Sequence, residues 1–153
     1  MKRVFLIILA LLLVGCAKPP PTVSDIKVVN QSQPGEPLEL APHLVKDKTT
    51  LVEYYSDHCG PCKEMIPVME FLAAHRSDLA IRKVDIDRKG VSVIDFDSPL
   101  AKQHDIHAVP CFKIYDPSGK LVASDRAAKD QVRTWYNDAQ RAATARTSSE
   151  GIK

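Results

Sequence analysis

The sequence predicts an α/β domain in which a mixed central sheet is covered by helices on both faces. Two observations lead to this fold class. The first is a strand, helix, strand order, in which TLVEYYS (50–56) and LAIRKVDID (79–87) flank a helical pattern at 61–75. The second is a hairpin pattern at 111–125 followed by a helical pattern at 128–141. The first unit gives parallel strands and the hairpin gives antiparallel ones, so the sheet must be mixed.

The two long helices are predicted from apolar residues at helical spacing. These residues are Met65, Ile66, Met69 and Leu72 in the first helix, and Val132, Trp135, Tyr136 and Ala139 in the last. In the hairpin, Pro117-Ser118-Gly119 supplies the turn chemistry. Before the hairpin we expect a loop and a short helix that ends near His104. The segment DIKVV (25–29) alternates weakly and can form an early strand.

The N-terminus has the layout of a secretory signal peptide. Lys2 and Arg3 precede an uninterrupted apolar run at 4–14. A permanent transmembrane helix is the weaker interpretation, because crossing a hydrocarbon core takes about 20 apolar residues. The run ends in Leu-Val-Gly-Cys16, which resembles the lipobox of bacterial lipoproteins, where the cysteine becomes the lipidated N-terminus. An ordinary signal peptide with a chance cysteine is the alternative, and both interpretations predict export.

We therefore divide the chain into four segments. Residues 1–15 are a lipoprotein signal peptide, and residues 16–42 are a lipidated, Pro-rich tether with six of the eleven prolines. Residues 43–141 form the folded domain, and residues 142–153 are a small, polar, flexible tail. The domain is expected to be lipid-anchored to a bacterial membrane through Cys16, facing the periplasm or the cell exterior.

The charge of the chain excludes one large class of partner. The formal net charge is +2, and removal of residues 1–15 takes away Lys2 and Arg3 and leaves zero. A neutral domain offers no electrostatic case for binding nucleic acid. We expect a monomer with a single domain.

The stretch SDHCGPCKEMIP (56–67) places two cysteines two residues apart at a predicted helix start. Cysteine reacts as the thiolate, and the N-terminus of a helix lowers the pKa of a thiol there. Cys59 is therefore the predicted nucleophile. Cys62, one turn into the helix, is the resolving thiol that attacks the mixed disulfide formed by Cys59. Gly60 and Pro61 shape the turn, since a first-turn proline has no N–H bond to lose.

Roles of the cysteine pair other than redox exchange have less support in the sequence. A static disulfide across two intervening residues constrains little of the unfolded chain. A zinc site needs about four ligands, and the sequence has one Cys-X-X-Cys motif. Covalent haem requires histidine directly after the second cysteine, where Lys63 stands. A Cu(I) site stays open because thiolates suit that ion, with Cys59, Cys62 and either Cys111 or His58 as its ligands.

These motifs together resemble the thioredoxin family over about residues 46–140. LVEYYSDHCGPCKEMIP resembles the family's strand, Cys-Gly-Pro-Cys motif and helix, with Pro67 at the position of the helix-kinking proline. AVPC resembles the family's cis-proline loop. The resemblance implies a thioredoxin-like fold in which Pro110 is cis and, with Val109, lines the groove that receives a substrate chain.

The resemblance also implies two charged groups near the cysteine pair. Glu53 falls at the position of the family's buried aspartate, and Lys83 at that of its partly buried lysine. Burial would raise the pKa of Glu53, and its carboxylate could then take the proton from Cys62. The charge of Lys83 would oppose that rise.

Three departures from the family pattern bear on substrate choice. His58 stands where the family usually has tryptophan, so the surface beside the nucleophile is titratable rather than flat and aromatic. The residues GVSVIDFDSP (90–99) lengthen the connection after the second predicted strand of the core. Cys111 replaces the threonine that usually follows the cis-proline, and is either a small buried residue or an accessory thiol.

The expected function is that of a membrane-tethered thiol:disulfide oxidoreductase that reduces disulfides of exported proteins. The Cys59–Cys62 disulfide would be its only redox group, with no cofactor and no bound metal. The Gly-Pro pair resembles that of reducing thioredoxins, so a membrane electron donor must supply electrons in an oxidising compartment. Two alternatives stay open: a Cu(I)-binding chaperone, and a non-catalytic thioredoxin-like binding module.

Overall fold

The computed structural model of the chain describes residues 25–150. The elements are β1 (Ile26–Val28), a 3₁₀ helix (Ala41–His43), β2 (Thr49–Tyr55), α1 (Gly60–His75), β3 (Leu79–Asp85), α2 (Pro99–His104), β4 (Cys111–Tyr115), β5 (Leu121–Ser124) and α3 (Asp125–Glu150). The predicted signal peptide and the predicted lipidation site Cys16 lie outside the described residues, as do residues 17–24 of the predicted tether and 151–153 of the predicted tail.

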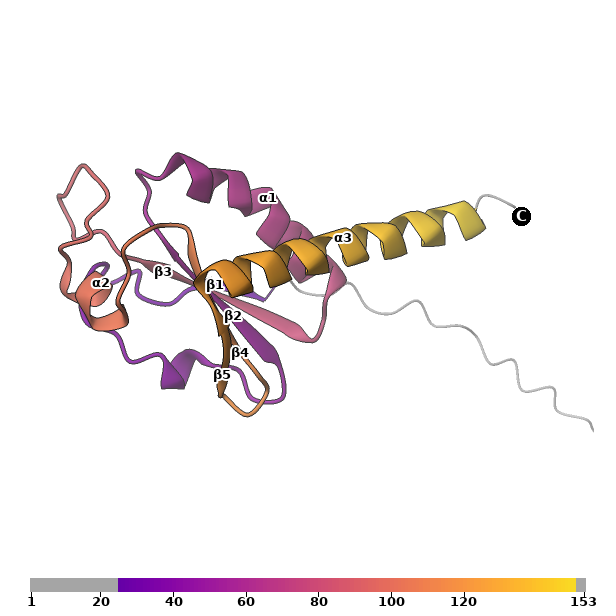
Figure 1. The fold of residues 1–153 in the computed structure, drawn as a ribbon, viewed down its shortest axis with the longest axis horizontal. Helices are drawn as coiled ribbons and strands as arrows, with labels where there is room; N and C mark the ends of the chain where they lie inside the picture. Colours follow the sequence, from indigo (N-terminus) through magenta and orange to yellow (C-terminus); the bar gives the residue numbers. More distant parts are fainter. Residues whose placement is uncertain (1–24, 151–153) are drawn as a thin grey trace, which may run out of the picture.

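The five strands form one sheet in the order β1-β3-β2-β4-β5. Figure 1 shows α1 and α3 on the same side of it. β1, β3 and β2 run parallel, whereas β4 and β5 are antiparallel to their neighbours. The predicted mixed sheet, its early strand at 25–29 and the hairpin are therefore confirmed. The crossover from β2 to β3 passes through α1, because parallel neighbours cannot be joined by a tight turn.

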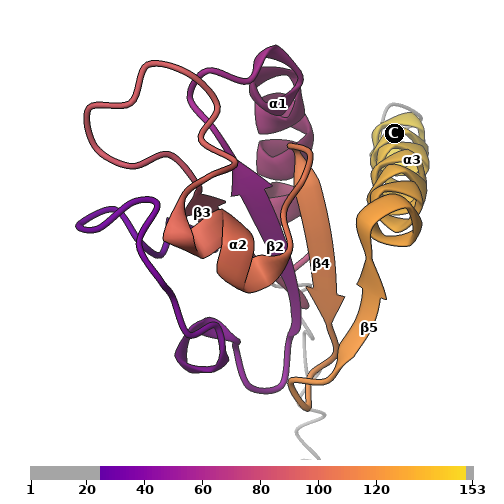
Figure 2. The ribbon, with the colours of Figure 1, turned by 60° about the vertical axis from the view of Figure 1, so that its left-hand side comes forward.

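Helices cover both faces of this sheet (Figure 2). α1 and α3 lie over one face, where the buried residues include Leu51, Met69, Leu72, Ile81, Phe112, Ile114 and Val132. The other face is covered by α2 and by the segment before β2, and its buried residues include Leu40, Val52, Tyr54, Val84, Ile86, Leu100 and Ile106. A strand covered on both faces is buried along its length, as β2 is.

The alternation of side chains along β2 determines where Glu53 lies. Leu51 belongs to the cluster under α1, and Val52 to the cluster on the opposite face. Since successive side chains of a strand point to opposite faces, Glu53 shares the α1 face with Leu51. In the neighbouring strand, Lys83 is its register partner. The sheet thus places a carboxyl and an amine together beneath the helix that carries the cysteines.

The tether predicted at 16–42 is too long. From residue 25 onward the chain packs on the domain, with β1 in the sheet and with Asn30 and Leu40 buried. The Asn30 side chain exchanges two hydrogen bonds with the backbone of Asp85 at the end of β3. Gly35 donates to the Asp85 carbonyl and accepts from Leu100 N–H of α2. The folded domain therefore includes residues 25–42 and does not begin at residue 43.

The last helix is longer than predicted. α3 continues to Glu150 rather than ending near Arg141, and Figure 1 shows it running beyond the sheet. The predicted stripe in its first half holds, because Val132 is buried and Trp135 and Tyr136 pack against the core. In α1 one expected core residue is wrong: Ile66 is 42% exposed, whereas Met69 and Leu72 are buried. Within residues 25–150, no helix has the length and apolar character to cross a membrane.

Candidate active site

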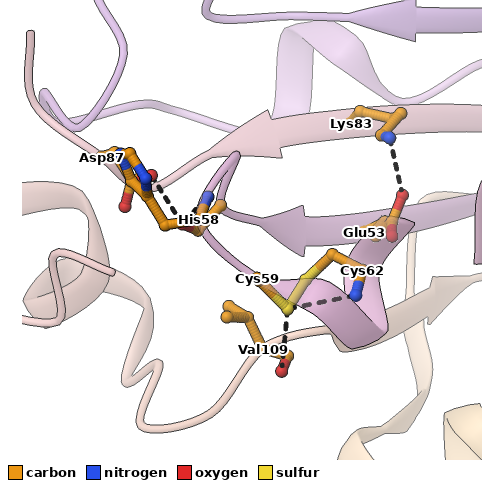
Figure 3. The surroundings of a disulfide bond; sticks show 8 residues. Glu53, His58, Cys59, Cys62, Lys83, Asp87 and Val109 are labelled. Carbon is orange, nitrogen blue, oxygen red and sulfur yellow. Dashed lines mark hydrogen bonds and ion pairs between the residues drawn. A yellow bond between two sulfur atoms is a disulfide. The ribbon is translucent and has the colours of Figure 1, made fainter. Parts of the chain in front are cut away.

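The cysteine pair lies where β2 ends and α1 begins. The loop 56–58 leaves β2, and Cys59 caps the N-terminus of α1. Cys59 and Cys62 form a disulfide with their Cα atoms 5.3 Å apart (Figure 3). Pro61 occupies the first turn, where its missing N–H removes no helical hydrogen bond. A single helical turn therefore brings the two sulfur atoms together.

The helix start gives the two sulfur atoms different surroundings. Sγ of Cys59 accepts a hydrogen bond from the backbone N–H of Cys62 at 3.1 Å, at the positive end of the helix dipole. Both residues are buried, at 2% and 3% exposure, so exposure does not distinguish a nucleophile from a resolving thiol. Their positions do distinguish them. After reduction, the same N–H would favour the thiolate form of Cys59.

A second loop closes over the disulfide. The Val109–Pro110 peptide is cis, which confirms the prediction for Pro110. The carbonyl oxygen of Val109 lies 3.5 Å from Sγ of Cys59 (Figure 3). Because β4 follows this loop and pairs with β2, the loop is fixed next to the helix start. A polypeptide that lay along Val109 and Pro110 would bring its own disulfide against Cys59.

Glu53 is fully buried on the α1 face beneath the cysteine pair. Nζ of Lys83 lies 3.3 Å from one carboxyl oxygen (Figure 3), at ion-pair distance but without hydrogen-bond geometry. Among the described residues, neither carboxyl oxygen of Glu53 has a hydrogen-bond partner. Burial raises the pKa of Glu53, and the charge of Lys83 opposes part of the rise. A carboxyl with a raised pKa is a better proton acceptor than an exposed glutamate.

The comparison with known proteins agrees with this geometry. The sequence profile of the family described as thioredoxin matches residues 38–138. The chain belongs to the thioredoxin family. Its membership and its disulfide-forming cysteine pair support thiol:disulfide oxidoreductase activity.

Three relatives illustrate the match. The chloroplastic F-type thioredoxin of Mesembryanthemum crystallinum is 36% identical over 54% of this chain, which spans 39% of that relative. The thioredoxin of Chlamydia trachomatis is 34% identical over 53% of this chain and 71% of its own length. The solved structure of spinach chloroplast thioredoxin F, short form, has a TM-score of 0.53 and 25% identity, over 78% of this chain and 96% of that one.

The loop before the nucleophile is held by polar contacts that the sequence did not predict. Oγ of Ser56 donates to the Asp87 carboxylate at 2.6 Å and accepts from the backbone N–H of His58 at 3.0 Å. Ser56 and Asp87 are both buried. Their positions in the sequence, just before the Cys-X-X-Cys motif and just after β3, were the one available signal. His58 is exposed, and its ring is turned toward the insertion 90–99.

Cys111 is a free, buried thiol at the start of β4. It donates to a carboxylate oxygen of Asp125 at 3.3 Å, where α3 begins. Burial and the nearby carboxylate raise the pKa of Cys111 to about 12. A thiol with this pKa stays protonated at neutral pH and is a poor nucleophile or metal ligand. The surroundings of Cys111 therefore favour the interpretation as a small buried residue over that as an accessory thiol.

The described residues hold no ready metal site. Within 25–150, no group of three or more His, Cys, Asp or Glu side chains is placed to hold a metal ion. Of the ligands considered for Cu(I), the Cys111 thiol faces Asp125 and the His58 ring faces Val91. Cys59 and Cys62 are bonded to each other. The chemistry that this site offers directly is the exchange of two electrons through the Cys59–Cys62 disulfide.

Proposed function

We propose that this chain is a membrane-tethered thiol:disulfide oxidoreductase that reduces disulfides of exported proteins. The observation that carries the proposal is the Cys59–Cys62 disulfide at the start of α1, beside the cis peptide before Pro110. In this position, the helix end favours the Cys59 thiolate and the loop can guide a client chain to it.

The reaction balances as two exchange steps. The Cys59 thiolate attacks one sulfur of the client disulfide, and the other client sulfur leaves as a thiolate. Cys62 then loses its proton, for which Glu53 is the proposed acceptor, and attacks the Cys59 sulfur. The second client thiolate leaves, and Cys59 and Cys62 form a disulfide. Two electrons have passed from the dithiol to the client.

A membrane electron donor is proposed to return the dithiol form. Thioredoxin has a potential of about −270 mV, well below that of the oxidising compartments outside the cytoplasm, so a reductase there needs electrons delivered to it. A solved complex of ferredoxin:thioredoxin reductase with thioredoxin f2, 26% identical to this chain with a TM-score of 0.50, supports a protein as the donor. The basic start, the apolar run and Cys16 support export and lipid anchoring.

Three single substitutions test the proposal. Cys59→Ser should abolish insulin reduction driven by dithiothreitol, because it removes the attacking thiolate. Cys62→Ser should retain the first attack and accumulate mixed disulfides, visible on non-reducing gels. Cys111→Ser is the matched control, since a hydroxyl can also donate to Asp125, and it should turn over like the wild type.

Continued turnover by Cys59→Ser would remove the enzyme interpretation. A wild-type protein that binds Cu(I) tightly and reduces nothing would instead favour the copper chaperone. Copper content should therefore be measured on the same preparation.

A further inference from the structure

The insertion 90–99 lies beside the disulfide. It connects β3 to α2 and runs next to the loop that enters α1 (Figure 2). Nε2 of His58 and the carbonyl oxygen of Val91 are 3.2 Å apart. A carbonyl oxygen can only accept, so this ring nitrogen carries the proton and donates. The residue directly before the nucleophile is thus hydrogen-bonded to the insertion.

Buried polar groups hold the insertion in one arrangement. Asp95 is 5% exposed, and its backbone N–H donates to the Asp87 carboxylate at 2.9 Å. Its own carboxylate accepts two hydrogen bonds from the Arg88 guanidinium, at 2.7 and 3.1 Å. Ser98, fully buried, caps α2 by accepting from the N–H of Ala101. Because a bidentate Arg–carboxylate pair restricts geometry, the insertion presents a defined surface.

Two large apolar side chains of the insertion are exposed and do not help to anchor it to the domain. Val93 is 64% exposed and Phe96 is 38% exposed. Ile94, between them in sequence, packs against a core cluster, whereas Val93 and Phe96 belong to neither cluster. The anchoring hydrogen bonds come from other side chains and from the backbone. A partner that covered Val93 and Phe96 would gain free energy in proportion to the apolar area removed from water.

The reaction itself brings a partner to this place. A client must put its disulfide at Cys59, and His58, the adjacent residue, contacts Val91. Val93 is two residues from Val91, so it lies within about 7 Å of that contact along the chain. We propose that Val93 and Phe96 form a docking surface that binds an apolar side chain near the disulfide of a protein client. This inference rests on the proposed function, because it names the substrate class that the same site prefers.

The test compares a protein disulfide with a small one. The double variant Val93→Ser/Phe96→Ser should raise the KM for insulin roughly three- to tenfold, the range expected when an apolar contact is lost from an interface. Reduction of bis(2-hydroxyethyl) disulfide should be unchanged, since that molecule reaches Cys59 without touching the insertion. The kcat for insulin should also be unchanged, because the redox chemistry is not altered.

The chain offers a matched control at the other end of the sheet. Leu121 and Val122 of β5 are 46% and 55% exposed. Leu121 pairs with Tyr115, which pairs with Thr50 near the start of β2, whereas the disulfide lies after the end of β2. Leu121→Ser/Val122→Ser should therefore leave both substrates unaffected.

Each other outcome overturns the inference. Equal insulin KM values for the wild type and the insertion variant would show that the side chains do not bind the client. Loss of small-disulfide reduction in that variant would mean that the insertion supports the redox centre itself. A wild-type dimer that the variant converts to a monomer would assign the surface to a second copy of this chain. A wild type that reduces neither substrate would instead refute the proposed function.

Discussion

Glu53 combines complete burial with a single nearby cation. Its titration therefore makes the free energy of unfolding of the domain depend on pH in a defined direction. A glutamate in the unfolded chain titrates near about 4.3, and burial raises the pKa in the folded state. Between the unfolded and the folded pKa the native state binds more protons than the unfolded one, so the free energy of unfolding falls as pH rises. The contribution is fully present below the unfolded pKa and is lost above the folded one.

Glu53→Gln should therefore stabilise the domain at neutral pH and slow its catalysis. The amide keeps the shape of the carboxyl and cannot ionise, so unfolding at neutral pH should cost about 1 kcal/mol more, because a buried neutral amide costs less to desolvate than a buried carboxylate. The advantage should shrink as pH falls toward about 4.3. Loss of the proton acceptor should slow attack by Cys62 about tenfold or more, with less effect on Cys59. Urea midpoints at several pH values and single-turnover kinetics measure the two effects.

Lys83→Met serves as the companion variant. It removes the charge that opposes the raised pKa of Glu53, so the fall in stability with rising pH should continue to a higher pH. A Glu53→Gln protein that is less stable than the wild type would mean that the ion pair with Lys83 outweighs desolvation. An unchanged resolution rate would remove Glu53 from the mechanism.

At the scale of the elements, the sequence predicted the strands and helices that bury a regular pattern of apolar side chains in the core. The strand predicted at 50–56 is observed as β2 at Thr49–Tyr55, and the helix predicted at 61–75 as α1 at Gly60–His75. The end of α3 was missed because residues 142–148 are almost entirely exposed and carry no apolar stripe, so only their helix propensity supports it. Ile66 was misplaced because it directly follows Met65, which faces the core, and adjacent residues diverge around a helix.

The candidate site also contains residues that could be predicted from the sequence and residues that could not. Cys59, Cys62 and Pro110 lie in contiguous motifs, so their chemistry could be inferred from sequence. The link between Ser56 and Asp87 could not, because the two residues are 31 positions apart and side-chain hydrogen bonds leave no periodic pattern. The packing of 25–42 was missed for a related reason. That segment is rich in proline and has few large apolar residues, and its contacts include backbone hydrogen bonds of Gly35 and side-chain hydrogen bonds of Asn30 that no periodic pattern predicts.

Gly35 provides a test of this packing. Its φ is +72°, and an added Cβ would lie 2.6 Å from the backbone nitrogen of Arg88, which follows β3. Gly90 has a similar φ of +82°, but nothing lies within 4 Å of its added Cβ. Gly90→Ala should cost about 1–2 kcal/mol for the left-handed conformation alone. Gly35→Ala should cost that amount and about 1–3 kcal/mol more for the steric clash. Urea midpoints of the two variants give the difference directly, and equal values would argue against a packed segment at residue 35.

On the scale of the whole molecule, the early start of the domain shortens the proposed tether. If Cys16 carries the lipid, only residues 17–24 separate it from the described domain. Eight residues span at most about 29 Å when fully extended. Ile26 pairs with Ile81, which pairs with Leu51 near the start of β2, whereas the disulfide follows the end of β2. The disulfide would therefore lie at the end of the sheet opposite the anchored one.

Replacing Cys16 tests this arrangement without touching the redox site. Cys16→Ala should move the protein from the membrane to the soluble or unprocessed fraction, because stable anchoring requires acyl chains on that cysteine. Insulin reduction by the purified variant should equal that of the wild type, since Cys59 and Cys62 are unchanged. Labelling with a radioactive fatty acid provides the direct measurement: the wild type and a Cys111→Ala control should incorporate label, and Cys16→Ala should not. If the wild type incorporates none, Cys16 is not lipidated, and the proposed anchor would have to be an uncleaved apolar segment or would not exist.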